Sequence, residues 1–362
     1  MSTAIKIGSV SIGDDQPFVV IPEACDNHHG SLSAAKELAA AAKEAGAQII
    51  KFQLHLPDEE MDREGMKKTS SRMFKRWGDL YGFIKQNLLS VEDHAELIHY
   101  CKKIGIQYFC TPFSVKAAAI LKEIGGDAAY KIGSGETEDL PLIDAVARLG
   151  RPMFISTGMS TIEEIDATVK VVRKQKIPFS LLHCISAYPP KSEVELHLGV
   201  IGELRRRYKT VVGFSDHTSP EGLTAANGRH IPESSIVWGA VGQGARYIEK
   251  HFTLDRKASD ADSRFSHDKE TLRELIAVAR VADSAFDAQR EVYPHERDVW
   301  VWAKRSLFAD QDLHKGDVIK RASLTSKRPG TGIRSKEYMS VIGKVAKRAI
   351  QKGEMILWKD VK

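Results

Sequence analysis

Long apolar runs are missing from this sequence of 362 residues, and so are low-complexity tracts and blocks of like charge. No run approaches the ~20 consecutive apolar residues that a membrane-spanning helix requires. Residues 1–6 carry no apolar core of signal-peptide length. We therefore expect a cytoplasmic protein that does not enter or cross a membrane.

Cysteine is also scarce, and its spacing disfavours disulfides and zinc sites. The chain has four cysteines, Cys25, Cys101, Cys110 and Cys184, and no C-x-x-C pair. Three of them lie in or at the end of apolar runs, which favours reduced, buried thiols over disulfides or zinc ligands. The net charge of +5 is mild, with Lys and Arg interspersed among Asp and Glu. We therefore expect no nucleic-acid partner, whereas a small anionic substrate remains open.

The sequence does contain a regular alternation of short apolar strands and helical segments. After a hairpin-like segment at 5–12, strand patterns occur at residues 18–23, 48–54, 107–111, 129–132, 152–156, 179–183, 211–215 and 246–252. Helical patterns occur at 31–45, 91–104, 114–124, 140–149, 161–174, 195–208, in part of 222–244, and at 268–285. This alternation over about 270 residues predicts an α/β fold, a closed (β/α)8 (TIM) barrel rather than an open sheet.

Polar side chains follow the predicted strands at their C-terminal ends, and all eight ends contribute. They are Glu23, Lys51, Gln53, Thr111, Lys131, Ser134, Glu136, Ser156, Ser186, Tyr188, Ser215, His217 and His251. In a barrel these ends converge on one mouth, which is where such folds build active sites. The sequence therefore predicts a catalytic site at the mouth.

Two histidines stand out in this set. His217 and His251 each close a short strand pattern, and the carboxylate of Asp262 follows the second. Neutral imidazoles and a carboxylate oxygen, with positions left open for substrate, suit a divalent metal. We expect Mn²⁺, with Mg²⁺ or Co²⁺ as alternatives.

Cations and hydroxyls in the same set indicate an anion site. Lys51 and Lys131 would place two ammonium groups in one cleft, and hydroxyls beside glycine-containing turns come from Ser134, Ser156 and Ser215. Such groups form a cradle for phosphate and carboxylate. Glu136 and Glu23 are then candidates for proton transfer, because neighbouring charges tune the pKa of carboxyl groups in a mouth.

The motifs that carry a family resemblance run along nearly the whole chain. They include the segments 27–30 (NHHG), 51–53 (KFQ), 111–114 (TPFS), 130–136 (YKIGSGE), 156–159 (STGM), 213–217 (GFSDH) and 249–256 (EKHFTLDR). Together they resemble the sialic acid synthase (N-acetylneuraminate synthase) family. Residues 305–361, with the loop 327–332 (KRPGTG), resemble its antifreeze-like (SAF) domain. The resemblance implies a barrel at 1–286, a linker at 287–301 and a mostly β SAF domain at 302–362.

The resemblance implies a transferase that condenses phosphoenolpyruvate with open-chain N-acetylmannosamine and water, releasing phosphate and forming a nine-carbon 2-keto acid. The residues implied for phosphoenolpyruvate are Lys51, Thr111, Lys131, Ser134, Ser156, Ser186 and Ser215. Those implied for the sugar are Glu23, Gln53, Tyr188, Asp262 and Arg328, with Glu136 near the enol. His217 and His251 would hold the metal. The SAF-like domain, with Arg328, would close over the barrel of the partner in a domain-swapped homodimer.

Departures from the family pattern leave the identity of the sugar open. They are residues 24–26 (ACD), 185–186 (IS), 258–261 (ASDA) and an apparent insertion at 227–235. A pseudaminic or legionaminic acid synthase, acting on a 2,4-diacetamido-2,4,6-trideoxyhexose, is the alternative. Two other classes compete: a Schiff-base aldolase with Lys131 or Lys51 as nucleophile, and a carbohydrate-binding protein without turnover.

Overall fold

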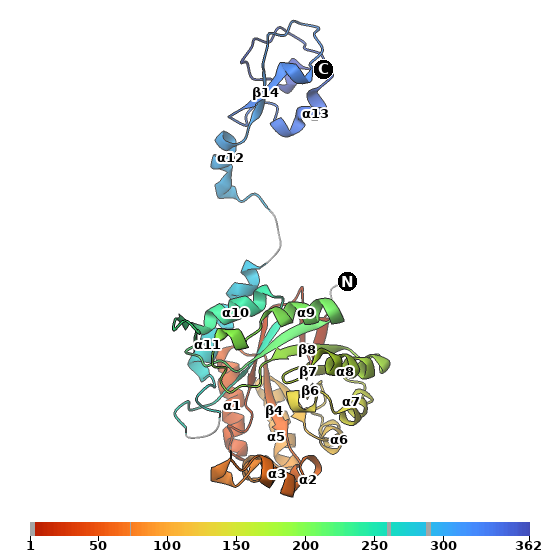
Figure 1. The fold of residues 1–362 in the computed structure, drawn as a ribbon, viewed down its shortest axis with the longest axis vertical. Helices are drawn as coiled ribbons and strands as arrows, with labels where there is room; N and C mark the ends of the chain where they lie inside the picture. Colours follow the sequence, from red (N-terminus) through yellow and green to blue (C-terminus); the bar gives the residue numbers. More distant parts are fainter. Residues whose placement is uncertain (1–3, 73, 259–261, 287–290) are drawn as a thin grey trace. The chain divides into compact units, whose positions relative to one another are not determined.

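The structure is a computed structural model, and it describes residues 4–72, 74–258, 262–286 and 291–362. Two compact units divide the chain, Met1–Asp287 and Ala288–Lys362 (Figure 1). In the described part of the chain, no helix combines the length and the apolar character needed to cross a bilayer. Residues 287–290 of the predicted linker and residues 259–261 of the predicted family departure lie outside the described ranges.

The first unit is built on an eight-stranded parallel sheet, ordered β5-β4-β3-β12-β9-β8-β7-β6. Its strands are β3 (Val19–Glu23), β4 (Ile49–Leu54), β5 (Gln107–Pro112), β6 (Tyr130–Ile132), β7 (Met153–Ser156), β8 (Phe179–Cys184), β9 (Val211–Asp216) and β12 (Tyr247–His251). The two end strands, β5 and β6, pack against each other and close the barrel. The predicted (β/α)8 barrel is confirmed.

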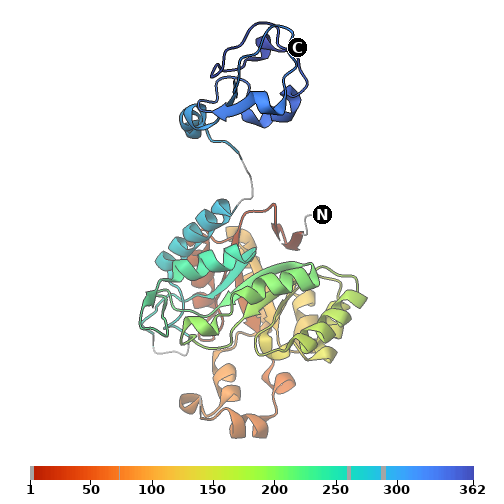
Figure 2. The same cartoon turned by 45° about the horizontal axis from the view of Figure 1, so that its top comes forward.

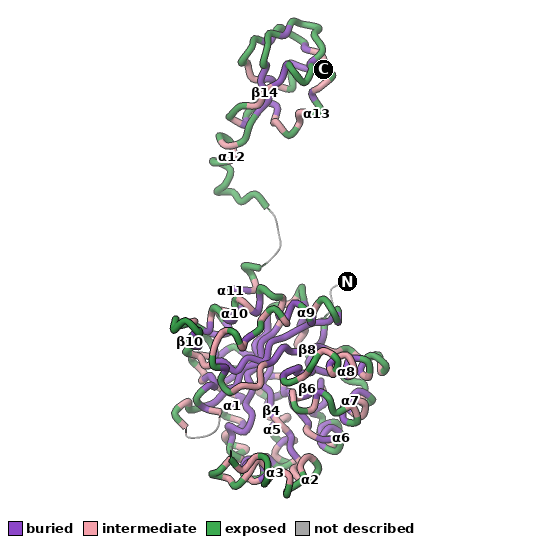
Figure 3. The backbone as a smooth tube through the Cα atoms, viewed as in Figure 1, coloured by how far each residue is buried: buried purple, intermediate pink, exposed green. Residues whose placement is uncertain are grey.

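Burial on both faces of the sheet explains why the sequences of these strands are nearly continuous apolar runs. Almost all of their residues are buried, because the barrel interior covers one face and the helices cover the other (Figure 3). The outer helices are α1 (Leu32–Ala45), α5 (Val91–Ile104), α6 (Val115–Glu123), α7 (Leu140–Ala147), α8 (Ile162–Lys174), α9 (Gly199–Tyr208), α10 (Glu233–Gly242) and α11 (Lys269–Ala285) (Figure 2).

Local sequence sets the ends of these helices. The Ser31 side chain accepts a hydrogen bond from the Ala34 N–H at the start of α1, and Gly46 ends that helix with a φ of 102°. Thr161 and Glu164 form a reciprocal capping box at the start of α8. These signals explain why the helix starts at 32 and 162 were readable from the sequence.

An N-terminal hairpin fills the end of the barrel at which the strands begin. Strands β1 (Ala4–Ile7) and β2 (Val10–Gly13) pair in antiparallel fashion. Ile7 and Ile12 join a buried cluster with Phe109, Phe154 and Tyr247 from the barrel interior. Since most strand residues in this cluster lie near strand starts, the hairpin plugs the N-terminal end and leaves the opposite end as the mouth.

Three parts of the first unit differ from the sequence prediction. No element was predicted between residues 54 and 91, where the structure has α2 (Pro57–Glu60), α3 (Arg63–Thr69) and α4 (Leu80–Asn87). The predicted helix at 195–208 begins only at Gly199. The segment read as an insertion contains the end of a small hairpin, β10 (Leu223–Thr224) and β11 (His230–Ile231), before α10. Such short elements carry too few turns for a helical or strand period to be visible.

The second unit has a small core of its own. Helix α12 (Arg297–Ala303) precedes the hairpin of β13 (Ser306–Ala309) and β14 (Leu324–Lys327). Isolated bridges and one short helix, α13 (Tyr338–Val341), complete the unit around a cluster that includes Leu307, Ile333, Ile350 and Ile356. The predicted linker range thus contains the start of a helix.

Candidate active site

The register of the barrel brings polar strand ends into one layer. His251 is paired with Glu23, Glu23 with Lys51, Gln53 with Thr111, and Glu249 with Ser215. All these pairs lie at or near the C-terminal ends of their strands. The side chains predicted to meet at the mouth therefore come from adjacent strands.

Two lysines and two glutamates form a buried ion network at the base of this mouth. Lys51 Nζ lies 2.5 Å from Glu23 Oε2 and 3.7 Å from Glu249 Oε1. Lys131 Nζ lies 3.3 Å from the same Glu249 oxygen. The Thr111 hydroxyl accepts from Lys51 at 3.2 Å, and the Ser215 hydroxyl lies 3.4 Å from Glu249. The structure thus brings both predicted lysines to one carboxylate.

The charges in this network perturb one another. Burial lowers the pKa of Lys51, but the nearby charges of Glu23 and Glu249 outweigh burial and raise it. For Lys131, burial wins over Glu249 and the pKa is lowered. Burial raises the pKa of Glu249, but Lys131 and Lys51 outweigh it, so the pKa is lowered and the carboxylate stays ionised. The ammonium group of Lys131 therefore loses its proton more readily than that of Lys51.

Glu249 is a site residue to which sequence reasoning assigned no role. It lies two residues before His251 on β12, so both side chains point to the same side of the strand. Lys250, between them, points the other way and pairs with Asp216 at 3.0 Å and Glu233 at 2.6 Å. The period of two in a strand was the signal that could have assigned Glu249 to the mouth.

Two serine hydroxyls lie close to the backbone of Gly158. The Gly158 N–H donates to Ser134 Oγ at 3.2 Å. A Cβ on Gly158 would lie 2.5 Å from Ser186 Oγ and 2.7 Å from Ser134 Oγ, so a larger residue does not fit without displacing them. Ser156 Oγ is buried and has no hydrogen-bond partner among the described atoms. Two of the serines predicted for phosphate, Ser134 and Ser186, therefore lie together at Gly158, and the hydroxyl of a third, Ser156, is unused.

Glu136 lies in the turn after β6, in a short 3₁₀ helix (Ser134–Glu136). Burial raises the pKa of Glu136, and Lys131 opposes that shift. A raised carboxyl pKa favours general acid–base chemistry. The role of Glu136 in proton transfer stays a prediction.

An aromatic and imidazole cluster forms another wall of the mouth. The ring centroids of His217 and His251 lie 5.2 Å apart, and those of Tyr188 and His217 lie 4.3 Å apart. Phe265 packs edge-on to His251 at 5.0 Å. His217 Nδ1 lies 2.9 Å from the Ile185 carbonyl, so in the neutral ring Nδ1 donates this hydrogen bond and Nε2 is the accepting nitrogen. Nε2 is the atom that a metal would bind.

Cys184 lies beside this cluster. Burial raises the pKa of its thiol, but a hydrogen bond and the charge of His217 outweigh burial, and the pKa is lowered to about 7. The same partner explains why the pKa of His217 is raised although burial alone would lower it. Each group therefore stabilises the charged form of the other: the Cys184 thiol loses its proton more readily, and the His217 imidazole holds its proton more strongly.

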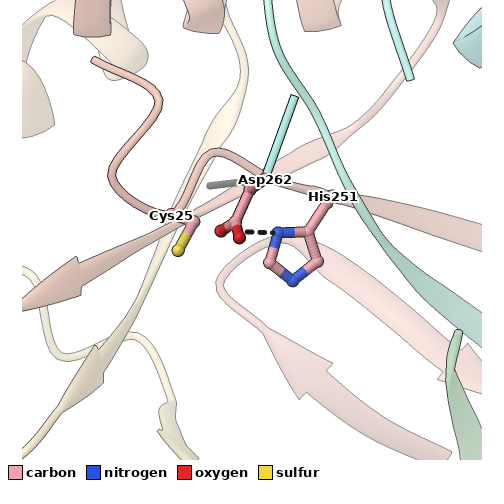
Figure 4. A group of neighbouring side chains, drawn as sticks. All are labelled: Cys25, His251 and Asp262. Carbon is pink, nitrogen blue, oxygen red and sulfur yellow. Dashed lines mark ion pairs between the residues drawn. The ribbon is translucent and has the colours of Figure 1, made fainter. Parts of the chain in front are cut away.

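Donor atoms capable of holding a metal converge beside His251. Atoms of Cys25, His251 and Asp262 all lie within 4.8 Å of one another (Figure 4). Asp262 Oδ2 lies 3.4 Å from His251 Nδ1, and the pKa of Asp262 is lowered because His251 outweighs burial. Cys25 was not among the predicted site residues, and His217 is outside this group of donors. Gln53 connects it to the ion network, donating to Glu23 at 2.8 Å and lying 3.3 Å from Cys25 Sγ.

Arg328 is the one predicted site residue outside the barrel. It is exposed in the second unit, where its Nε donates to the Ala303 carbonyl at 3.2 Å and its guanidinium lies 5.9 Å from the Trp302 ring. Its role at a barrel mouth stays a prediction.

Fold and site together define a class: a TIM-barrel protein whose mouth carries a buried network of lysine and glutamate side chains, followed by a small β-rich unit. Residues 38–291 match the NeuB family, and residues 304–362 match the SAF domain. The chain therefore belongs to the NeuB family, and the resemblance found in its motifs is confirmed.

Named relatives match nearly the full length. An N,N'-diacetyllegionaminic acid synthase of Campylobacter jejuni is 32% identical, covering 93% of this chain and 98% of the relative. A pseudaminic acid synthase of the same species is 32% identical, covering 96% and 97%. The crystal structure of an N-acetylneuraminic acid synthetase from Leptospira borgpetersenii matches with a TM-score of 0.71 and 30% identity, covering 83% of this chain and 95% of that one.

Proposed function

We propose that this protein is a nonulosonic acid synthase. It condenses phosphoenolpyruvate with the open-chain aldehyde of an N-acetylated amino-hexose and water, forming a nine-carbon 2-keto acid and releasing phosphate. The observation that carries the proposal is the pair of buried ammonium groups of Lys51 and Lys131, which meet at one carboxylate beside a set of serine hydroxyls. The family and the names of the relatives support the same reaction.

The two ammonium groups of the mouth would bind an anionic substrate in competition with the two carboxylates that pair with them in the free protein. The two lysines are balanced by Glu23 and Glu249, so the free network is close to neutral. Phosphoenolpyruvate carries about two to three negative charges near neutral pH and competes with these carboxylates for the ammonium groups. The unused hydroxyl of Ser156 and the serines around Gly158 supply further donors.

A divalent metal supplies the remaining positive charge in this proposal, with Mn²⁺ as the first expectation. His217 and His251 would hold it, and the hydrogen bond from His217 Nδ1 to a backbone carbonyl already selects the tautomer that binds a metal. When bound, such a metal polarises an aldehyde oxygen. Glu136, with its raised pKa, is the group that we propose for proton transfer near the enol.

For the sugar we propose a 2,4-diacetamido-2,4,6-trideoxyhexose. The two synthases at 32% identity are named for products with two acetamido groups or for the related pseudaminic acid. The aromatic wall of Tyr188 and Phe265 offers apolar surface for a deoxy sugar, while Gln53 and Asp262 offer polar contacts. N-acetylmannosamine is the second candidate, supported by the match to the Leptospira enzyme.

Phosphate release from phosphoenolpyruvate, measured across a panel of amino-sugars, tests the proposal. We expect release only when an accepted sugar is present, and highest with a 2,4-diacetamido sugar. Full activity in excess chelator, with borohydride trapping at Lys131 or Lys51, would instead show the Schiff-base aldolase. Sugar binding without phosphate release would show a carbohydrate-binding protein.

A further inference from the structure

Cys25 occupies an unusual position for a cysteine. It lies just after β3, is 8% exposed, and adopts a left-handed backbone conformation with φ of 47°. The turn is fixed by the neighbouring Ala24 N–H, which donates to the Lys51 carbonyl at 2.9 Å. Non-glycine residues rarely adopt this conformation, and where they do the surrounding structure holds them there. The thiol is thus placed at the mouth by the barrel itself.

A buried imidazole atom faces the same spot without a hydrogen bond. His251 is 9% exposed, and among the described atoms its Nδ1 has no hydrogen-bond partner. Asp262 Oδ2 lies 3.4 Å away, at ion-pair distance from this nitrogen. A buried polar atom left unpaired costs free energy unless something binds it. Nitrogen, oxygen and sulfur donor atoms therefore lie within 4.8 Å of one another, and among them His251 Nδ1 lacks a hydrogen bond (Figure 4).

We propose that Cys25 is a thiolate ligand of the divalent metal, together with His251 and Asp262, and that this sulfur shifts the metal preference from Mn²⁺ towards Zn²⁺ or Co²⁺. This inference deepens the metal site of the proposed function and rests on it. Thiolate selects softer metals, whereas imidazole and carboxylate donors alone also accept Mn²⁺. On binding, the S–H bond breaks, its proton passes to solvent, and the sulfur–metal bond forms. All four cysteines are free and buried, as expected from the sequence, and this proposal gives one of them, Cys25, a role that the sequence did not indicate.

The test uses the full-length protein, stripped with a chelator and loaded with Co²⁺ in the absence of substrate. Thiolate bound to Co²⁺ gives an intense near-ultraviolet charge-transfer band, which nitrogen and oxygen donors do not give. We expect this band in the native chain and its loss in Cys25→Ser. Cys184→Ser should keep the band, although its thiol lies beside His217. Cys101→Ser, which changes a thiol in the main core on α5, is the control for general effects of losing a cysteine.

A second measurement compares the affinities for Zn²⁺ and Mn²⁺ by competition with a chromophoric chelator. Changes even in the outer shell of a metal site cost ~10–100-fold in affinity, so Cys25→Ser should lower the Zn²⁺/Mn²⁺ affinity ratio at least ~10-fold. Asp262→Asn should weaken both metals. Thermal unfolding of each metal-free variant shows whether it is folded.

The outcomes separate this inference from the proposed reaction. A band that persists in Cys25→Ser, a band lost in Cys184→Ser, or no Co²⁺ band in the native chain would each overturn the role of Cys25. Phosphate release is assayed separately with Mn²⁺ and with Zn²⁺. Loss of the Co²⁺ band in a folded Cys25→Ser chain supports the ligand whatever the rate of phosphate release, whereas a native chain with the band but without phosphate release would overturn only the reaction.

Discussion

Removal of the Lys131 ammonium should weaken phosphoenolpyruvate binding selectively. Lys131 Nζ lies 3.3 Å from Glu249, and its side chain is only 4% exposed. At an effective dielectric constant of about 20, a unit charge at that distance is worth about 5 kcal/mol before desolvation is subtracted. Net values for hydrogen bonds to charged groups are nearer ~1.5–3 kcal/mol. We therefore expect Lys131→Met to raise KM for phosphoenolpyruvate about 10- to 100-fold.

The KM for the sugar should change little in the same variant, because the sugar contacts are proposed on the side of Gln53, Tyr188 and Asp262. The matched control is Lys250→Met, which also removes a buried, paired lysine but on the other side of β12. That variant should lose stability, by about 3–5 kcal/mol, without a selective rise in KM for phosphoenolpyruvate. Initial-rate kinetics with each substrate varied in turn measure both. Equal losses for the two substrates in Lys131→Met, or the same selective loss in Lys250→Met, would refute the anion cradle.

Three further predictions concern the metal, the pH dependence of stability and the second unit. His217→Ala and His251→Ala should each abolish activity and metal binding while the barrel stays folded by circular dichroism; normal turnover in metal-depleted buffer would contradict the site. Glu233 has its pKa lowered to about 2, because the ammonium of its lysine partner outweighs burial. Its stabilisation is therefore present above pH ~4.5 and lost as the pH falls towards ~2, a contribution of about 3 kcal/mol. Urea unfolding from pH 6 to 2 should show a smaller pH dependence in Glu233→Gln, and an unchanged slope would argue against the ion pair. Arg328→Ala should lose most activity, and mixing it with a Glu136→Gln chain should restore up to one working site per mixed dimer. No recovery after proven subunit exchange would mean that Arg328 does not act on a partner's mouth.

The barrel was readable from the sequence because each strand is short and apolar, and because most of the outer helices begin with a side-chain N-cap. Polar residues at the strand ends could be predicted as a group, since the C-terminal ends of parallel strands meet at one face. The helices between 57 and 87 were not readable, because each has too few turns to show a period. Their positions depend on tertiary contacts such as that of Lys116 with Glu59, at 2.9 Å.

The individual contacts in the mouth were harder to predict than its composition. Glu249 lay in a recognised motif, but its position between two lysines depends on the distances across three strands. Cys25 was noted only as part of a departure from the family pattern, because nothing in the linear sequence places it beside Asp262, which is more than two hundred residues away. Spatial convergence of this kind is set by the fold and not by local pattern.

The hairpin plug has a consequence for the order of events during turnover. Because Ile7 and Ile12 fill the N-terminal end of the barrel, the substrates and products of the proposed reaction would enter and leave by the mouth. Lys51 and Lys131 lie deep, each 3% exposed, whereas Tyr188 at the rim is 56% exposed. In the proposed reaction, a sugar bound against Tyr188 would cover the lysines, so we expect phosphoenolpyruvate to bind first. Steady-state kinetics should then show an ordered mechanism in which phosphoenolpyruvate binds before the sugar. Inorganic phosphate should compete with phosphoenolpyruvate, and it should stay bound until the nine-carbon product leaves.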